Sequence, residues 1–144
     1  MVAIGSDHGG FDLKEQVVEY LKIKNISVKD VGCYGKESCD YPTYGKEVAK
    51  AVLSGECEKG IVICTTGIGI SIAANKYKGI RAALCADTLS AKLTRLHNNA
   101  NILALGAGIV GPELAISIVD TFLSTEFSGE ERHQRRVNAI ENEI

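Results

Sequence analysis

The feature that most constrains the fold is an alternation of short apolar runs with segments of helical periodicity. Five such runs occur along the chain, and a helix-like segment follows each of them. In the first unit the run Val2–Ser6 precedes residues 11–24, in which Leu13, Val17 and Leu21 are four apart. Five strand–helix units without a break in composition predict one α/β domain over residues 1–144, with a doubly wound, five-stranded parallel sheet.

The boundaries of the expected elements follow from the same pattern and from turn residues. Pro42 is expected just before the second helix, and Asp87 is expected to be the N-cap of a later one. The expected strands are 2–6, 27–31, 60–64, 80–85 and 101–105. The expected helices are 11–24, 44–54, 68–76, 88–96, 112–125 and 130–142.

Charge and cysteine usage exclude several classes of function. The formal net charge of −2 at pH 7 gives no basic surface for nucleic acid or membrane. No apolar run is long enough to span a bilayer, and the N-terminus lacks the pattern of a signal peptide. The five cysteines are odd in number and include no CxxC pair. This argues against a disulfide framework or a structural zinc site, and it predicts a reducing, cytoplasmic location.

The turn after the third strand carries most of the functional information. Cys64 ends a buried apolar run, and the glycines Gly67 and Gly69 then lead into a helix. Amides at a helix N-terminus bind anions and favour a thiolate. Cys64 could therefore act as a base beside amides that stabilise a negatively charged intermediate. Taken alone, the turn is equally consistent with a tight strand-to-helix connection, since it matches neither a Walker A loop nor GxGxxG.

Other polar residues follow strands or share a helical face. In a doubly wound sheet ligands bind beyond the carboxyl ends of the strands, so Asp7 and His8, and also His97 and Asn98, are expected where a site can form. Near the C-terminus, two arginines are spaced four apart on one helical face, an arrangement that suits a phosphate monoester. A solvated basic face is the alternative there. These arginines are Arg132 and Arg136.

Together these motifs resemble the type B ribose-5-phosphate isomerases, a family that includes galactose- and allose-6-phosphate isomerases. The resemblance covers essentially the whole chain and implies a Rossmann-like α/β/α layer. It rests on several motifs in one order: Gly-Ser-Asp7-His8-Gly-Gly, Asp40-Tyr41-Pro42, Cys64-Thr-Thr66-Gly67-Ile-Gly69-Ile-Ser71, Gly79-Ile-Arg81, His97-Asn98 and Arg132-His133-Gln-Arg-Arg136.

The resemblance implies an aldose–ketose isomerase without metal or cofactor, which interconverts ribose 5-phosphate and ribulose 5-phosphate through ring opening and an enediolate. It makes Cys64 the base, and His97, assisted by Thr66, the group that opens the ring. One branch of the family has a glutamate base at the position of Ile70, so this chain resembles the cysteine type. The implied substrate-binding residues are Asp7, His8, Tyr41, Thr65, Gly67, Ile68, Gly69 and Asn98. The implied phosphate-binding residues are His8, Arg132 and Arg136, with His133 in a supporting role.

The resemblance also implies a homodimer, or a tetramer, in which the C-terminal helix packs on a partner subunit and the site is completed across the interface. Two positions depart from the family pattern. Thr65 stands where many members have glycine, and Gly108 stands where many have an arginine that reaches the phosphate from the partner subunit. Loss of that arginine predicts weaker phosphate binding or compensation by another cation.

Three other readings stay open at this point. A 6-phosphohexose isomerase would use the same chemistry on a longer sugar, and a sugar-phosphate sensor would use the same fold without turnover. A nucleotide-binding protein is disfavoured, since no acidic ribose-binding residue follows the second strand in the required glycine motif. The sequence does not separate pentose phosphate metabolism from the catabolism of rarer sugars.

Overall fold

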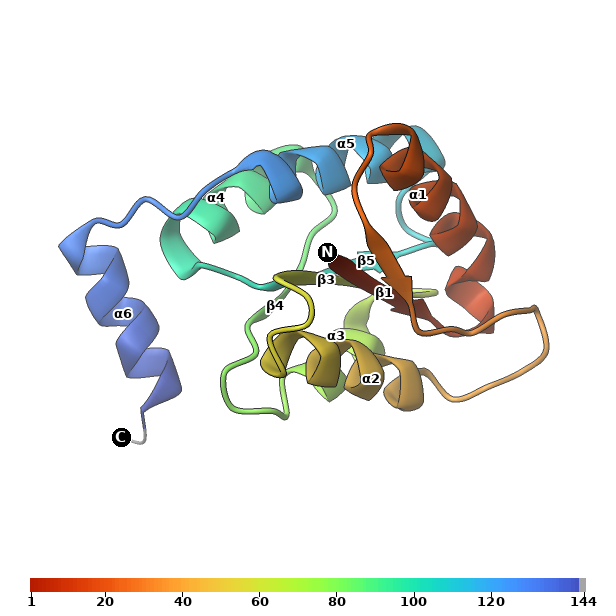
Figure 1. Ribbon diagram of the computed structural model, residues 1–144, viewed down its shortest axis with the longest axis horizontal. Helices are drawn as coiled ribbons and strands as arrows, with labels where there is room; N and C mark the ends of the chain where they lie inside the picture. Colours follow the sequence, from red (N-terminus) through yellow and green to blue (C-terminus); the bar gives the residue numbers. More distant parts are fainter. Residues whose placement is uncertain (143–144) are drawn as a thin grey trace.

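The five apolar runs form one parallel sheet in the computed structural model, which describes residues 1–142 (Figure 1). The strand order is β2-β1-β3-β5-β4, and every neighbouring pair is parallel. The three inner strands are buried along nearly their whole length, because helices cover both faces of the sheet. The predicted fold class is thus confirmed. The strands are β1 Val2–Ser6, β2 Val28–Asp30, β3 Lys59–Cys64, β4 Ala82–Leu84 and β5 Ile102–Gly106.

Two hydrophobic layers fix the helices on the sheet (Figure 1). On one face, Val17 of α1 and Phe122 of α5 are fully buried, and α4 belongs to the same layer. On the other face, Val48 of α2 and Ala74 of α3 are buried against Val62 of β3. The helices are α1 Phe11–Ile23, α2 Tyr41–Leu53, α3 Ile68–Ala74, α4 Thr88–Asn98, α5 Pro112–Ser124 and α6 Glu131–Glu141.

The predicted boundaries were wrong mainly at the edges of the sheet and at one helix start. The edge strands β2 and β4 are shorter than the predicted 27–31 and 80–85, because each pairs on one side only. Helix α2 begins at Tyr41 instead of residue 44, with Pro42 inside its first turn, where a missing N–H costs nothing. The sequence also gave no sign of a short 3₁₀ turn, η1, at His8–Gly10.

The direction of α4 decides where its C-terminal residues lie. This helix follows the edge strand β4 and returns the chain to the start of β5, one strand further in, so it runs antiparallel to the strands. The residues after α4 therefore lie at the amino ends of the strands. Asn101, for example, accepts a hydrogen bond through its carbonyl from the Gly60 amide at the start of β3, at 2.9 Å.

Helix α6 stands apart from the two layers and projects beyond the sheet (Figure 1). Residues 125–130 connect it to α5 without regular secondary structure. Its buried residues are His133 and Val137, and it packs against α4. Within residues 1–142 no helix has the length and apolar character that crossing a bilayer requires.

Candidate active site

The turn between β3 and α3 holds the sulfur of Cys64 against a backbone amide. The Gly67 N–H donates to Sγ of Cys64 at a nitrogen–sulfur distance of 3.1 Å, and Cys64 is 5% exposed. The sulfur of Cys64 thus accepts a backbone hydrogen bond at the start of a helix. Gly67 is in the left-handed region, with φ at 77°. A Cβ there would lie 2.5 Å from Cδ1 of Leu84 and 2.7 Å from the Leu105 carbonyl carbon, so only glycine fits.

Cys64 opens onto a cavity of about 390 Å³ at the carboxyl ends of β1 and β3. The ring of Tyr41 packs over Gly69, where a Cβ would come within 2.6 Å of it. The hydroxyl of Thr66 accepts a hydrogen bond from the Ile68 amide at 3.2 Å. The cavity thus combines a thiol, hydroxyls, a carboxylate and amides at the start of a helix. Its lining residues are Asp7, Tyr41, Cys64, Thr65, Thr66, Ile68 and Gly69.

The loop after β1 contributes Asp7 and His8 at the same end of the sheet. Asp7 is buried, and its Oδ1 accepts a hydrogen bond from the Gly10 amide at 3.0 Å, which caps η1. Nδ1 of the exposed His8 accepts from the Cys39 amide at 3.2 Å. A neutral His8 therefore carries its proton on Nε2, and this nitrogen can donate to an anion. Nothing in the sequence indicates the contact with the Cys39 amide, because a backbone contact of this kind depends on loop conformation.

His97 and Asn98 do not join this group, so the expectation that one edge of the sheet gathers all the polar residues was wrong within one chain. They end α4 at the amino ends of the strands, for the reason given above. Cys64 lies at the other end of β3, four residues beyond Gly60. At about 3.3 Å per residue this separates the two ends by roughly 13 Å along the strand.

His97 instead meets residues of α6. Its ring lies against that of His133, with the ring centroids 4.4 Å apart and the planes tilted by 37°. Nε2 of His133 accepts from Nε of Arg132 at 3.4 Å, while Nη2 of Arg132 pairs with Glu130 at 3.0 Å. Burial, with His97, Arg132 and Arg136 nearby, lowers the pKa of His133 below its usual value, and Glu130 opposes this. A neutral histidine thus sits among exposed arginines on α6.

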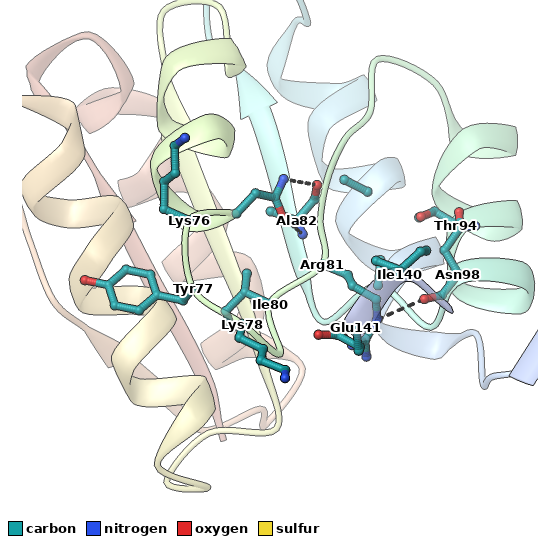
Figure 2. Close-up of a pocket in the computed structure, with 13 residues that line it drawn as sticks. Lys76, Tyr77, Lys78, Ile80, Arg81, Ala82, Thr94, Asn98, Ile140 and Glu141 are labelled. Carbon is teal, nitrogen blue, oxygen red and sulfur yellow. Dashed lines mark hydrogen bonds and ion pairs between the residues drawn. The ribbon is translucent and has the colours of Figure 1, made fainter. Parts of the chain in front are cut away.

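A larger cavity, of about 650 Å³, lies between α6, α4 and the segment that connects α3 to β4. Of the candidate substrate residues it contains only Asn98. Arg81 forms an ion pair with Glu141 and donates through Nε to the Asn98 carbonyl at 3.1 Å, so its donors are already used. Figure 2 shows the side chain of Tyr77 pointing away from this ion pair. The smaller cavity instead contains the Cys64 thiol together with most of the candidate substrate residues.

A model of the ribose/galactose isomerase family matches residues 2–140.

The chain belongs to this family. It is 50% identical over 139 residues to ribose-5-phosphate isomerase B of Escherichia coli, an alignment that covers 96% of this chain and 93% of the relative. The structure of Clostridium thermocellum ribose-5-phosphate isomerase B superposes with a TM-score of 0.95 at 56% identity, covering 96% of this chain and 93% of that one. A ribose 5-phosphate isomerase from Thermotoga maritima gives the same TM-score and identity, with 97% and 96% covered.

The two departures from the family pattern, Thr65 and Gly108, contact each other. The Gly108 amide donates to the Thr65 carbonyl at 2.8 Å, and a Cβ at Gly108 would lie 3.1 Å from Cγ2 of Thr65. A Cβ at Gly9 would overlap with the Thr65 hydroxyl. The Thr65 side chain therefore fills the space between the loops that follow β1 and β5. The sequence showed two separate departures, whereas the structure shows one packed unit beside the cavity.

Proposed function

We propose that this chain interconverts ribose 5-phosphate and ribulose 5-phosphate by moving a proton between C2 and C1 of the open sugar. The observation that carries the proposal is the thiol of Cys64, held 3.1 Å from the Gly67 amide at the mouth of a polar cavity. The identity of 50% to an isomerase of this specificity supports the choice of substrate. The chemistry uses only groups of the protein, so turnover should persist in EDTA.

The Cys64 thiolate acts as the base in this proposal. It takes the proton from C2 of the aldose, and the electron pair of the C–H bond moves toward the carbonyl to give an enediolate. The amides of the turn, with Thr66, Gly67 and Gly69, stabilise the negative oxygen. A proton passes from O2 to O1, and the thiol returns its own proton to C1. The C2 carbonyl of the ketose forms in this step, and the thiolate is restored. Asp7 and Tyr41 line the same cavity and hold sugar hydroxyls.

A second copy of the chain supplies the rest of the site. His97 protonates the ring oxygen during opening, Asn98 binds a hydroxyl, and Arg132 and Arg136 bind the phosphate together with His8. This assignment follows from the separation of the two groups of residues at opposite ends of β3 in one chain. The remote phosphate contacts can then orient the reacting carbons. In a homodimer with two-fold symmetry, each copy completes the site of the other.

An exposed apolar surface gives that second copy a place to bind. It surrounds the unpaired edge of β4 and includes side chains from both flanking helices. An open strand edge with apolar neighbours is a common site of association. With α6 projecting beside this edge, we propose that it packs on the partner subunit. The residues of this surface are Ile68, Ile72, Leu84, Leu89 and Leu93. We also propose a cytoplasmic location, since all five cysteines are free thiols.

The direct test is the initial rate of ketose formation from ribose 5-phosphate in EDTA, with allose 6-phosphate as a parallel substrate. We expect turnover of the pentose. Turnover of only the hexose would keep the mechanism and change the substrate. Absence of turnover with either sugar would refute the proposed activity and favour a sensor, which would still bind the sugar phosphate after Cys64→Ala.

A further inference from the structure

Ser128 lies in the segment between α5 and α6, and this segment is hydrogen-bonded to the end of α4. The Ser128 amide donates to the Leu96 carbonyl at 3.3 Å, one of the last carbonyls of α4, which have no partner within the helix. The buried Arg95 donates through Nε to the Thr125 carbonyl at 3.0 Å. The backbone around Ser128 is therefore fixed next to the residue that precedes His97.

The hydroxyl of Ser128 reaches the ring of His133. Oγ lies 2.8 Å from Nδ1 of His133, and it also accepts from the Glu130 amide at 3.2 Å. The other ring nitrogen, Nε2, faces Nε of Arg132, which is only a donor. In the neutral ring Nε2 is thus the acceptor, Nδ1 carries the proton, and Ser128 accepts from Nδ1. Two hydrogen bonds and burial then leave the ring a single orientation.

His133 in turn contacts two residues of the proposed site. It lies against the ring of His97 at a centroid distance of 4.4 Å, and it accepts from Arg132 through Nε2. Arg132 donates through Nε to His133 and pairs through Nη2 with the exposed Glu130, which a phosphate would have to displace or share. A neutral His133 also avoids placing a third cation beside Arg132 and Arg136, and burial favours the neutral form.

We propose that Ser128 is a positioning residue for the isomerase reaction: its hydroxyl fixes the Nδ1–H form and the orientation of His133, which holds His97 and Arg132 in place. The proposal rests on the proposed function and adds to it a residue that does not touch the substrate. His97 lies on α4 and Arg132 lies on α6. A fixed His133 ring, which contacts both, would keep these two side chains in a constant position relative to each other.

The first test observes the His133 ring directly by nitrogen-15 NMR on the full chain, with His133→Gln to assign its signals. We expect the Nδ1–H form in the wild type and in Ser128→Thr, which keeps the hydroxyl. In Ser128→Ala we expect a shift toward the Nε2–H form. A wild-type ring protonated at Nε2 would overturn the proposal, and this measurement needs no variant that perturbs folding.

The second test is kinetic. Ser128→Ala should lower kcat/KM for ribose 5-phosphate by roughly 10- to 100-fold through misplacement of His97 and Arg132. Ser128→Thr should recover most of that loss. The matched control is Ser124→Ala, since the exposed Ser124 hydroxyl lies 3.5 Å from a carbonyl of its own helix. If the wild type is active and Ser128→Ala has the same kcat/KM as Ser124→Ala, the role of Ser128 is refuted. A wild type without isomerase activity would refute the proposed function instead.

Discussion

The two groups of residues in the proposed site are built in different ways. The group around Cys64 depends on backbone: a left-handed glycine, an amide on the sulfur and the start of a helix. The group around His97 depends on side chains, which meet through a ring contact and hydrogen bonds between α4 and α6. The backbone-built group is complete within one chain, whereas the role proposed for the His97 group requires a second copy that brings it to a thiol.

This difference has a physical cause. The turn after β3 lies between two inner strands and is surrounded by close contacts, so it has little freedom to change. Helix α6 has only two buried residues, His133 and Val137, and the segment before it has no regular secondary structure. Stability is therefore unevenly distributed: the proposed base lies in the closely packed turn, and the proposed phosphate ligands lie on the more weakly packed helix α6.

The largest effect should follow removal of the base. Cys64→Ala should lower kcat for ribose 5-phosphate by about 10²- to 10⁴-fold, because proton transfer loses its acceptor. The matched control is Cys85→Ala, with activity within about twofold. Burial, reinforced by Asp87, raises the pKa of the Cys85 thiol to about 11, so it stays protonated near neutral pH. Wild-type kcat in Cys64→Ala would contradict the assignment of the base.

A second substitution tests whether the backbone of the turn is as constrained as the contacts indicate. Gly67→Ala should lower the free energy of unfolding by about 2–5 kcal/mol, through the left-handed φ and the clash with Leu84 and Leu105. Gly55 also has a positive φ, of 82°, but an added Cβ there would meet open space. Gly55→Ala should therefore lower the free energy of unfolding by only about 1–2 kcal/mol. Urea denaturation measures both. Equal losses would mean that the turn can relax around a side chain.

A smaller effect, on KM for ribose 5-phosphate, is expected when an arginine side chain is added at Gly108. Gly108→Arg places a cation beside the cavity, but its Cβ must fit 3.1 Å from Cγ2 of Thr65. We expect the combined variant Thr65→Gly/Gly108→Arg to lower KM for ribose 5-phosphate by about three- to tenfold, and Gly108→Arg alone to gain less. Equal KM values for the combined variant and Thr65→Gly would show that position 108 does not reach the phosphate.

The features that could be predicted from the sequence are those that depend on residues close together in the chain. Apolar runs and helical periodicity located the strands and helices, and Asp87 caps α4 as expected, with its Oδ1 accepting from the Ser90 amide at 2.6 Å. The glycine turn after Cys64 was likewise recognisable, because its chemistry follows from residues adjacent in the chain. These features depend on contacts within a few residues of one another, so a single sequence carries them.

Features that depend on topology were harder to predict. The strand order β2-β1-β3-β5-β4 is not visible in the sequence, whereas the position of His97 at the amino ends of the strands follows from the parallel β4–α4–β5 connection alone. The fully buried Lys14, paired with Asp30 at 2.6 Å, could not be expected from a charged residue in an amphipathic helix. The hydrogen bond between Ser128 and His133 could not be predicted either, because it depends on the path of residues 125–130.

The sharing of one active site between two copies is the central claim, and subunit complementation tests it most directly. Cys64→Ala and His97→Asn are each expected to be nearly inactive with ribose 5-phosphate. Unfolded together and refolded as a mixture, they should recover about a quarter of wild-type activity, because half of the dimers are mixed and each has one complete site. The control mixes Cys64→Ala with the double variant Cys64→Ala/His97→Asn, which contains no Cys64 in any combination. A mixture no more active than its separate parents would contradict the shared site.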